Sequence, residues 1–267
     1  YQESELIGGV VIFNKETDFT AGNKSMTVSL TNQFCLAMRN LIYLDQEIER
    51  KQEKAQLKIS NEIQSALFPK DMPKLPNVEL AGSNIPAKEV GGDYYDLIQI
   101  DENNLVGIIA DVSGKGIPAA LLVSMVKTVF KMLVKEMDKI NPSEILYKLN
   151  NIFCEEDIDG RFITAIAFHI DIKTNNINFS NAGHGPIIIY DDQKNKIVNY
   201  DLNGTVLGFM ENENFESRKI KLNRNDIALL YTDGLTEARN TDGEFFGEER
   251  VEKIVTDIRK YPAPYIL

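Results

Sequence analysis

Near the start of the chain, apolar residues recur with helical spacing. The stretch from about Ser25 to Leu67 also contains no proline or glycine that would interrupt a helix. Apolar positions recur there at alternating spacings of three and four, a heptad seam formed by Phe34, Ala37, Leu41, Leu44 and Ile48. A helix of about 40 residues is about 60 Å long, which exceeds the core of an ordinary domain. The pattern predicts a long connecting helix. It either pairs with a copy of itself and carries a signal, or serves as a solvated spacer.

A proline-rich stretch, "FPKDMPKLP" at Phe68–Pro76, ends this helix and marks a boundary. Beyond it, short apolar runs alternate with polar turns, a pattern typical of β-hairpins. The clearest pairs of runs are Leu97–Ile100 with Leu105–Ala110, Phe162–Ile170 with Ile177–Phe179, and Ile187–Tyr190 with Ile197–Tyr200. We predict that these runs form antiparallel strands.

Two longer segments, Ile117 to Met137 and Pro142 to Cys154, have helical patterns and interrupt the hairpins. Near the start of the chain, Leu6 to Asn14 ("LIGGVVIFN") has the composition of a strand. Hairpins with few helices favour the α+β class and a layered sandwich over a doubly wound parallel sheet.

The composition narrows the class of partner. The chain has 267 residues, 29 Lys and Arg against 40 Asp and Glu, a net charge of -11 and 43% hydrophobic residues. This acidic balance argues against nucleic acid and against an anionic membrane surface. Two isolated cysteines, no signal peptide and no run of about 18 apolar residues favour a cytoplasmic protein. The chain begins at Tyr1 without a methionine, so we expect it to be a fragment of a longer protein.

Three separate places combine an aspartate with glycine at the end of an apolar run. They are Asp93 in "GGD", Asp111 in "IIADVSGKG" and Asp233 in "YTDG". Glycine lets the backbone approach closely, so carbonyl oxygens can join carboxylates around an ion. An all-oxygen site selects Mg²⁺ or Mn²⁺ rather than zinc. Aspartate and glycine are also ordinary turn residues, so this pattern alone leaves both interpretations open.

The glycines after Asp111 admit other hypotheses. A phosphate-binding P-loop needs GxxxxGK followed by Ser or Thr, but Gly116 follows Lys115 here, so that motif is absent. The segment "GKGIPA" does match a loose dinucleotide-binding pattern. Against it, Asp111 would repel the pyrophosphate, and strands joined by hairpins do not form a βαβ unit.

Several motifs together resemble the metal-dependent PPM-type serine/threonine phosphatases, in particular the bacterial SpoIIE-like and RsbU-like branch. They are "GGDYYD", "IADVSGKGIPAALL", "FITAIAFHID", "NAGHGP", "VLG" and "RNDIALLYTDGLTEARNTDGEFFGEERV", in the family's order. The resemblance covers about three quarters of the chain, from Phe68 onward. Residues 1–43 resemble more weakly the last strand and helix of a GAF sensor domain. The resemblance therefore implies a partial GAF-like segment (1–43), a connecting helix (44–68) and a phosphatase domain (69–267).

The resemblance implies an α/β/β/α sandwich of two antiparallel sheets flanked by helices, with two Mn²⁺ or Mg²⁺ ions at one edge. The implied catalytic metal ligands are Asp93, Asp111, the carbonyl of Val112, and Asp233. A water held by two ions would attack the phosphorus of a phosphoserine. The implied substrate is a phosphorylated STAS-type anti-anti-sigma protein, and the connecting helix is expected to form a homodimer.

For several other polar residues the sequence supports less specific hypotheses about their roles. His184 in "NAGHGP" is either a general acid for the leaving alkoxide or a structural hydrogen-bonding group. We expect His169 to lie in the core and Lys115 to be solvated. For Tyr94, Tyr95 and Asp96 we expect packing and turn roles, with an outer metal-shell role for Asp96 as the alternative.

The chain departs from the family pattern at its end. The pattern closes with a strand preceded by a DDxT-like motif that supplies another metal ligand, but this chain stops at "RKYPAPYIL". Two interpretations follow: the chain is truncated, or the site is incomplete. The second would make the protein a pseudophosphatase that binds its partner without turnover.

Overall fold

The computed structural model describes residues 18, 20–86, 90–156, 158 and 160–267. The chain divides into two compact units, Tyr1–Leu57 and Lys58–Leu267. The strand expected at Leu6 to Asn14 lies outside the described residues, so the GAF-like segment stays a prediction.

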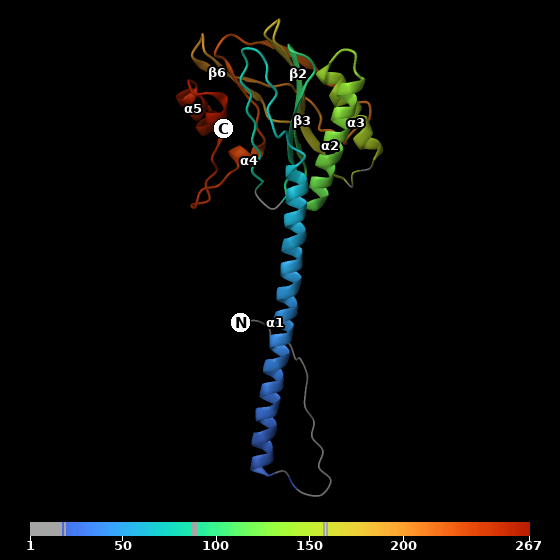
Figure 1. Ribbon diagram of the computed structural model, residues 1–267, viewed down its shortest axis with the longest axis vertical. Coiled ribbons are helices and arrows are strands. Elements are labelled where there is room, and N and C mark those ends of the chain that lie inside the picture. The colour runs from blue at the N-terminus through green and yellow to red at the C-terminus, as the bar shows by residue number, and fades with distance from the viewer. Residues whose placement is uncertain (1–17, 19, 87–89, 157, 159) are drawn as a thin grey trace. The chain divides into compact units, whose positions relative to one another are not determined.

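Helix α1, Ala21–Ser65, is continuous through 45 residues (Figure 1). It begins a few residues before the predicted start because Thr20 and Asn23 cap its first turn reciprocally. The Thr20 amide donates to the Asn23 side chain (3.0 Å), and the Asn23 amide donates to the Thr20 hydroxyl (3.2 Å). The helix ends just before the proline-rich stretch, as predicted. Every member of the heptad seam is exposed.

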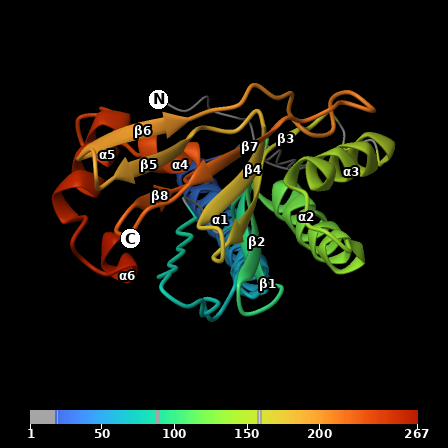
Figure 2. The ribbon, with the colours of Figure 1, turned by 90° about the horizontal axis from the view of Figure 1, so that it is seen from above.

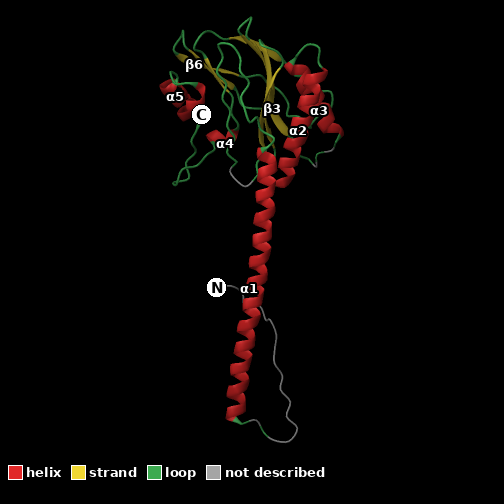
Figure 3. Ribbon diagram, viewed as in Figure 1, coloured by secondary structure: helices red, strands yellow, loops and turns green. Residues whose placement is uncertain are grey.

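The strands of the second unit form two antiparallel sheets, which confirms the predicted hairpins (Figure 3). The five-stranded sheet has the order β1-β2-β3-β4-β7, and the three-stranded sheet has the order β6-β5-β8. The bounds are β1 Asp93–Gln99, β2 Asn104–Val112, β3 Ile163–Asp171, β4 Asn176–Ala182, β5 Ile187–Asp191, β6 Lys196–Tyr200, β7 Ser217–Lys221 and β8 Ile227–Leu229. Every strand pair among the described residues is antiparallel. The βαβ unit that a dinucleotide site requires is therefore not formed around the Asp111 loop, and that hypothesis is wrong.

Helices cover the outer faces of the two sheets. Helices α2 (Ile117–Glu136) and α3 (Pro142–Glu155) lie on the five-stranded sheet, and α5 (Glu248–Ile258) lies on β5 and β6 (Figure 2). Two short helices complete this unit, α4 (Asp233–Thr236) and α6 (Ala263–Ile266). The layer order is α/β/β/α, so the predicted fold class is confirmed.

Successive side chains along the strands of the five-stranded sheet point to opposite faces and pack into two separate hydrophobic cores. On one face, Ile163 and Ala165 pack with α2 and α3, whereas Ile166 and Phe168 face the three-stranded sheet and its Ile189. A central sheet with both faces apolar must be covered on both sides. This requirement fixes the order of the layers.

Helix α2 is, within the part of the chain that the structure describes, the one helix long and apolar enough to cross a membrane. Here it is a core helix, because Val123, Val126 and Phe130 are fully buried against the sheet. Its composition therefore reflects its place in the core.

Candidate metal centre

Strand register places Asp93 directly opposite Asp111. The two residues are partners in the antiparallel ladder between β1 and β2. Their neighbours Tyr94, Ala110 and Val112 belong to the core beneath α2, so both aspartates lie on the opposite face, toward the second sheet. Like charges directly opposite one another destabilise a sheet. A cation between them would remove this cost.

Gly92 allows the β1 end to approach the end of β2. The Val112 amide donates to the Gly92 carbonyl (3.1 Å). A Cβ atom on Gly92 would lie 2.5 Å from the Val112 carbonyl oxygen and 3.3 Å from Asp111 Oδ1. Only glycine fits this approach without displacement. The Val112 carbonyl therefore lies at the same strand end as the two carboxylates.

Asp233 reaches the same place from the three-stranded sheet. We expected it at the end of a strand, but β8 stops at Leu229 and Asp233 is the first residue of α4, after the N-cap Thr232. One carboxylate oxygen from each of Asp93, Asp111 and Asp233 lies within 4.8 Å of the others. Residues far apart in sequence therefore converge at the edge between the two sheets.

The cluster raises the pKa of its own carboxyl groups. Burial first, and then the charges of Asp93, Asp233 and Glu237, raise the pKa of Asp111 to about 7. Burial and the charge of Asp233 also raise the pKa of Asp93, and a hydrogen bond from the Thr232 side chain opposes this rise. Mutual repulsion and desolvation therefore destabilise the cluster in the absence of a cation.

The donor set fits a hard divalent cation. All three side chains offer carboxylate oxygens, and the Val112 carbonyl lies beside them. Oxygen ligands of this kind suit Mg²⁺ and Mn²⁺.

Both ring nitrogens of His184 lie within hydrogen-bonding distance of a partner. Thr164 Oγ1 lies 2.8 Å from Nδ1, and the Tyr231 carbonyl oxygen lies 3.1 Å from Nε2. Burial lowers the pKa of the imidazole, so the neutral form predominates at neutral pH. A carbonyl can only accept, so Nε2 carries the hydrogen and donates it to Tyr231. This geometry favours the structural interpretation over the general acid.

The remaining candidates do not join the cluster. Lys115 is exposed, as expected. His169 is half-buried rather than in the core, and it bonds the Asn104 side chain (3.0 Å). Buried Asp96 accepts a hydrogen bond from Tyr94 (2.9 Å).

Asp96 also pairs with Lys131 of α2 at 3.5 Å. It therefore joins β1 to α2, on the face away from the carboxylate cluster. Tyr95 packs against Phe68, with ring centroids 5.5 Å apart. These contacts give Asp96 and Tyr95 packing roles.

Three residues near the centre were missed by sequence reasoning. Thr232 bonds Asp93, Glu237 adds negative charge near Asp111, and Gln64 holds the backbone before Asp93. Thr232 and Glu237 stand in the motif around Asp233, which is the one signal that could have marked them. Nothing in the helical pattern distinguishes Gln64 from its polar neighbours.

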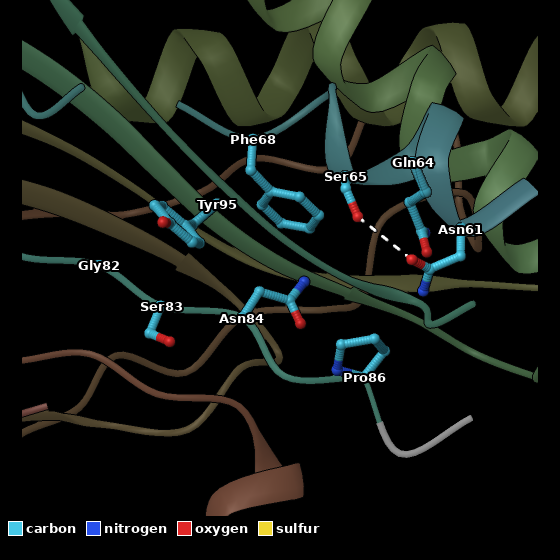
Figure 4. A pocket seen from close by; sticks show the side chains of 9 residues that line it. All are labelled: Asn61, Gln64, Ser65, Phe68, Gly82, Ser83, Asn84, Pro86 and Tyr95. Carbon is cyan, nitrogen blue, oxygen red and sulfur yellow. Dashed lines mark hydrogen bonds between the residues drawn. The ribbon is translucent and has the colours of Figure 1, made fainter. Parts of the chain in front are cut away.

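Gln64 is the buried residue of α1, and it clamps the glycine pair next to Asp93. Its amide nitrogen donates to the Gly91 carbonyl (2.6 Å), and its amide oxygen accepts from the Gly91 amide (3.0 Å). Beside this clamp is a pocket of about 280 Å³ between the end of α1 and the segment 82–86 (Figure 4). Asn84 lines the pocket and donates to the Asp93 carbonyl (3.4 Å).

The two-sheet sandwich with a carboxylate cluster at its edge has the form of a PPM-type, or PP2C-type, domain. The chain belongs to the stage II sporulation protein E (SpoIIE) family, whose sequence profile matches residues 101–266. The chain is 30% identical over 205 residues to the phosphoserine phosphatase RsbU of Bacillus subtilis, covering 76% of this chain and 60% of RsbU. It is 24% identical over 270 residues to the protein IcfG of Synechocystis sp., covering 90% of this chain and 42% of IcfG.

Among solved structures, the SiaA-PP2C domain of Pseudomonas aeruginosa superimposes with a TM-score of 0.68 at 19% identity. The match covers 81% of this chain and 87% of that domain. At this identity the likeness establishes the fold alone. The chain spans about half the length of the curated relatives it matches.

Proposed function

We propose that this chain is a metal-dependent protein phosphatase that hydrolyses phosphoserine or phosphothreonine on a regulatory phosphoprotein. The observation that carries the proposal is the convergence within 4.8 Å of three carboxylates, two from the ladder between β1 and β2 and one from the start of α4. Family membership supports the same activity, since the relative RsbU is named a phosphoserine phosphatase.

In this proposal Asp93, Asp111, Asp233 and the Val112 carbonyl hold two Mn²⁺ or Mg²⁺ ions. When bound, such ions activate water and stabilise charge on a transferring phosphoryl group. The carboxylates orient the ions and balance their charge. The ladder between β1 and β2 holds two of these ligands at a fixed separation. No side chain is required as a covalent nucleophile.

The proposed substrate is a phosphorylated STAS-type anti-anti-sigma protein, whose dephosphorylation would switch its binding partner. Membership of the SpoIIE family and the similarity to RsbU support this substrate class. The negative net charge of the chain is compatible with a protein substrate rather than nucleic acid. Two cysteines without a disulfide, Cys35 and Cys154, are consistent with action in the cytoplasm.

We further propose that the connecting segment 44–68, which includes the second half of α1, carries a signal to this site from a GAF-like segment (1–43) to the phosphatase domain (69–267). Two contacts at the end of α1 support a coupling. Gln64 holds Gly91, and Lys127 of α2 donates to the Leu67 carbonyl. A displacement of the helix end would thus reach both Asp93 and α2, the helix that follows the Asp111 loop.

The activity is tested by adding Mn²⁺, Mg²⁺ or NAD to the purified chain and following its thermal unfolding and the release of phosphate from a phosphorylated STAS-type protein. We expect Mn²⁺ or Mg²⁺ to stabilise the fold and support turnover, and NAD to do neither. Metal binding without phosphate release from any phosphoprotein tested would favour the pseudophosphatase. No stabilisation by either metal would contradict the proposed site.

The helix is also proposed to form a parallel homodimer through its seam, where Phe34, Leu41 and Leu44 are each more than half exposed. Sedimentation of the protein at micromolar concentration tests this assembly. We expect Leu44→Lys to dissociate the dimer and Gln46→Lys, an exposed change off the seam, to leave it intact. A monomeric wild-type protein would contradict the dimer.

A further inference from the structure

His184 lies in the turn between β4 and β5, where the chain passes from the five-stranded sheet to the three-stranded sheet. Asn181 fixes this turn from both directions. The His184 amide donates to Asn181 Oδ1 (2.8 Å), and Asn181 Nδ2 donates to the His184 carbonyl (2.9 Å). The imidazole therefore projects from an anchored piece of backbone.

The ring joins one sheet to the other. Its Nδ1 accepts from Thr164 of β3 (2.8 Å), and its Nε2 donates to the carbonyl of Tyr231, which follows β8 (3.1 Å). Both ring nitrogens thus form hydrogen bonds, Nδ1 as the acceptor and Nε2 as the donor. The imidazole is oriented by both partners at once.

Each partner of the ring lies beside a member of the carboxylate cluster. Thr164 is the ladder partner of Asp111 and lies on the same face of the sheet, since Ile163 and Ala165 belong to the core on the opposite face. Tyr231 precedes Asp233 by two residues. The path from Asp111 through Thr164 and His184 to Asp233 therefore crosses from sheet to sheet.

We propose that His184 is a positioning residue that sets the separation between Asp233 and the Asp93–Asp111 pair, and hence the cation affinity of the site. The inference rests on the proposed metal centre. Apolar packing between the sheets is non-directional, and Asp233 is exposed after a strand of only three residues. The directional bonds of His184 supply the restraint that this packing lacks.

Two replacements of His184 separate its two bonds. His184→Gln places an amide nitrogen near the original Nε2, so the bond to the Tyr231 carbonyl can be kept. His184→Asn places an amide oxygen near the original Nδ1, so the Thr164 bond can be kept while the bond to the Tyr231 carbonyl is lost. Thr164→Val removes the other end of the bridge with little change in shape.

The test measures Mn²⁺ binding to the 267-residue chain by electron paramagnetic resonance, without reference to turnover. Partners beyond the first ligands typically change metal affinity by about 10- to 100-fold. We expect His184→Asn to weaken Mn²⁺ binding by about 10-fold or more. His184→Gln should remain closer to wild type, and the two variants should unfold at similar temperatures when no metal is present. Thr164→Val should weaken binding, and its effect should not add to that of His184→Asn.

Other results would overturn the inference. Wild-type Mn²⁺ affinity in His184→Asn would exclude a positioning role. Equal losses of affinity and metal-free stability in the Asn and Gln variants would indicate a packing role. Lost turnover at unchanged Mn²⁺ affinity, with one limb missing from the pH profile, would indicate a proton donor. A wild-type chain that binds no Mn²⁺ would instead overturn the proposed metal centre, and this inference with it.

Discussion

The two sides of the candidate metal centre hold their aspartates by different means. On the five-stranded sheet, Asp93 and Asp111 are half-buried ladder partners in β1 and β2. On the other side, Asp233 is exposed and starts the four-residue α4, after the three-residue β8. Backbone hydrogen bonds of a sheet hold the first two, whereas the third lies outside these ladders, two residues after Tyr231, whose carbonyl accepts from His184.

This difference predicts two kinds of response to mutation. The sheet side has little room, since a Cβ on Gly92 meets the Val112 carbonyl oxygen at 2.5 Å. The α4 side has room but depends on individual hydrogen bonds, from Thr232 to Asp93 and from His184 to Tyr231. Changes on the sheet side should therefore abolish cation binding, and changes on the α4 side should weaken it by degrees.

The largest effect is expected from Asp111→Asn. It removes a carboxylate from the centre of the cluster, so Mn²⁺-dependent phosphate release should be abolished. The metal-free fold should be as stable as wild type or more stable, because repulsion from Asp93 and Asp233 is relieved. Phosphate release and thermal unfolding in EDTA measure both outcomes.

The matched control is Asp257→Asn, the same change at an exposed position of α5. It should alter neither quantity. Retained Mn²⁺-dependent turnover in Asp111→Asn would contradict the assignment of the site.

A comparison of two glycines tests the steric difference directly. Gly92→Ala forces a Cβ against the Val112 carbonyl, and such overpacking costs about 1–3 kcal/mol. We expect it to lower the unfolding temperature and to displace the Asp111 strand end, so that Mn²⁺ no longer stabilises the chain.

In Gly234→Ala the new Cβ would lie 3.5 Å from Asp93 Oδ2, an ordinary contact. Metal-induced stabilisation should therefore be close to that of wild type. Equal effects of the two substitutions, measured by thermal unfolding with and without Mn²⁺, would remove the distinction between the two sides.

A smaller effect should appear as a pH dependence confined to the sheet side. Burial and neighbouring carboxylates raise the pKa of Asp111 to about 7, whereas an unfolded aspartate titrates near 4. Between about pH 4 and about pH 7, Asp111 is therefore protonated in the folded state and ionised in the unfolded state. The free energy of unfolding of the metal-free chain should therefore fall as pH rises from about 4 to about 7, and this contribution should level off above.

Mn²⁺ must displace the same proton, so its affinity should increase over the approach to pH 7. Denaturant unfolding in EDTA across this range, with Asp111→Asn as reference, measures the stability slope. Identical slopes in the two proteins would exclude Asp111 as its source.

The smallest effect is expected from Thr232→Val, which keeps the shape and removes the hydrogen bond to Asp93. Thr232 makes no side-chain cap to α4, so loss of the hydroxyl should act mainly through Asp93. We expect Mn²⁺ binding to weaken by about 10-fold. Thr232→Ser, which retains a hydroxyl, should bind nearly as wild type does. Mn²⁺ titration distinguishes them, and equal weakening would show that the methyl group matters rather than the bond.

The sequence by itself determined the local elements and the positions of the three aspartates. Alternation with period two and turn residues between apolar runs specify hairpins such as β1–β2, and apolar spacing specifies α2 and α3. Aspartate and glycine at the ends of apolar runs marked Asp93, Asp111 and Asp233. These signals are local, because each depends on neighbours within a few residues. The family motifs added the order of the layers.

Only the tertiary structure decided how these elements meet. Sequence alternation states which face of a strand is apolar, but it contains no information on the distance between two sheets or on the partner of a polar side chain. The burial of Gln64 beside Gly91, and the two ring bonds of His184, arise from residues distant in sequence. The start of α4 at Asp233 likewise differs from the expected strand end. The distance between two layers depends on the volumes of the side chains packed between them, and residues throughout the domain contribute those side chains.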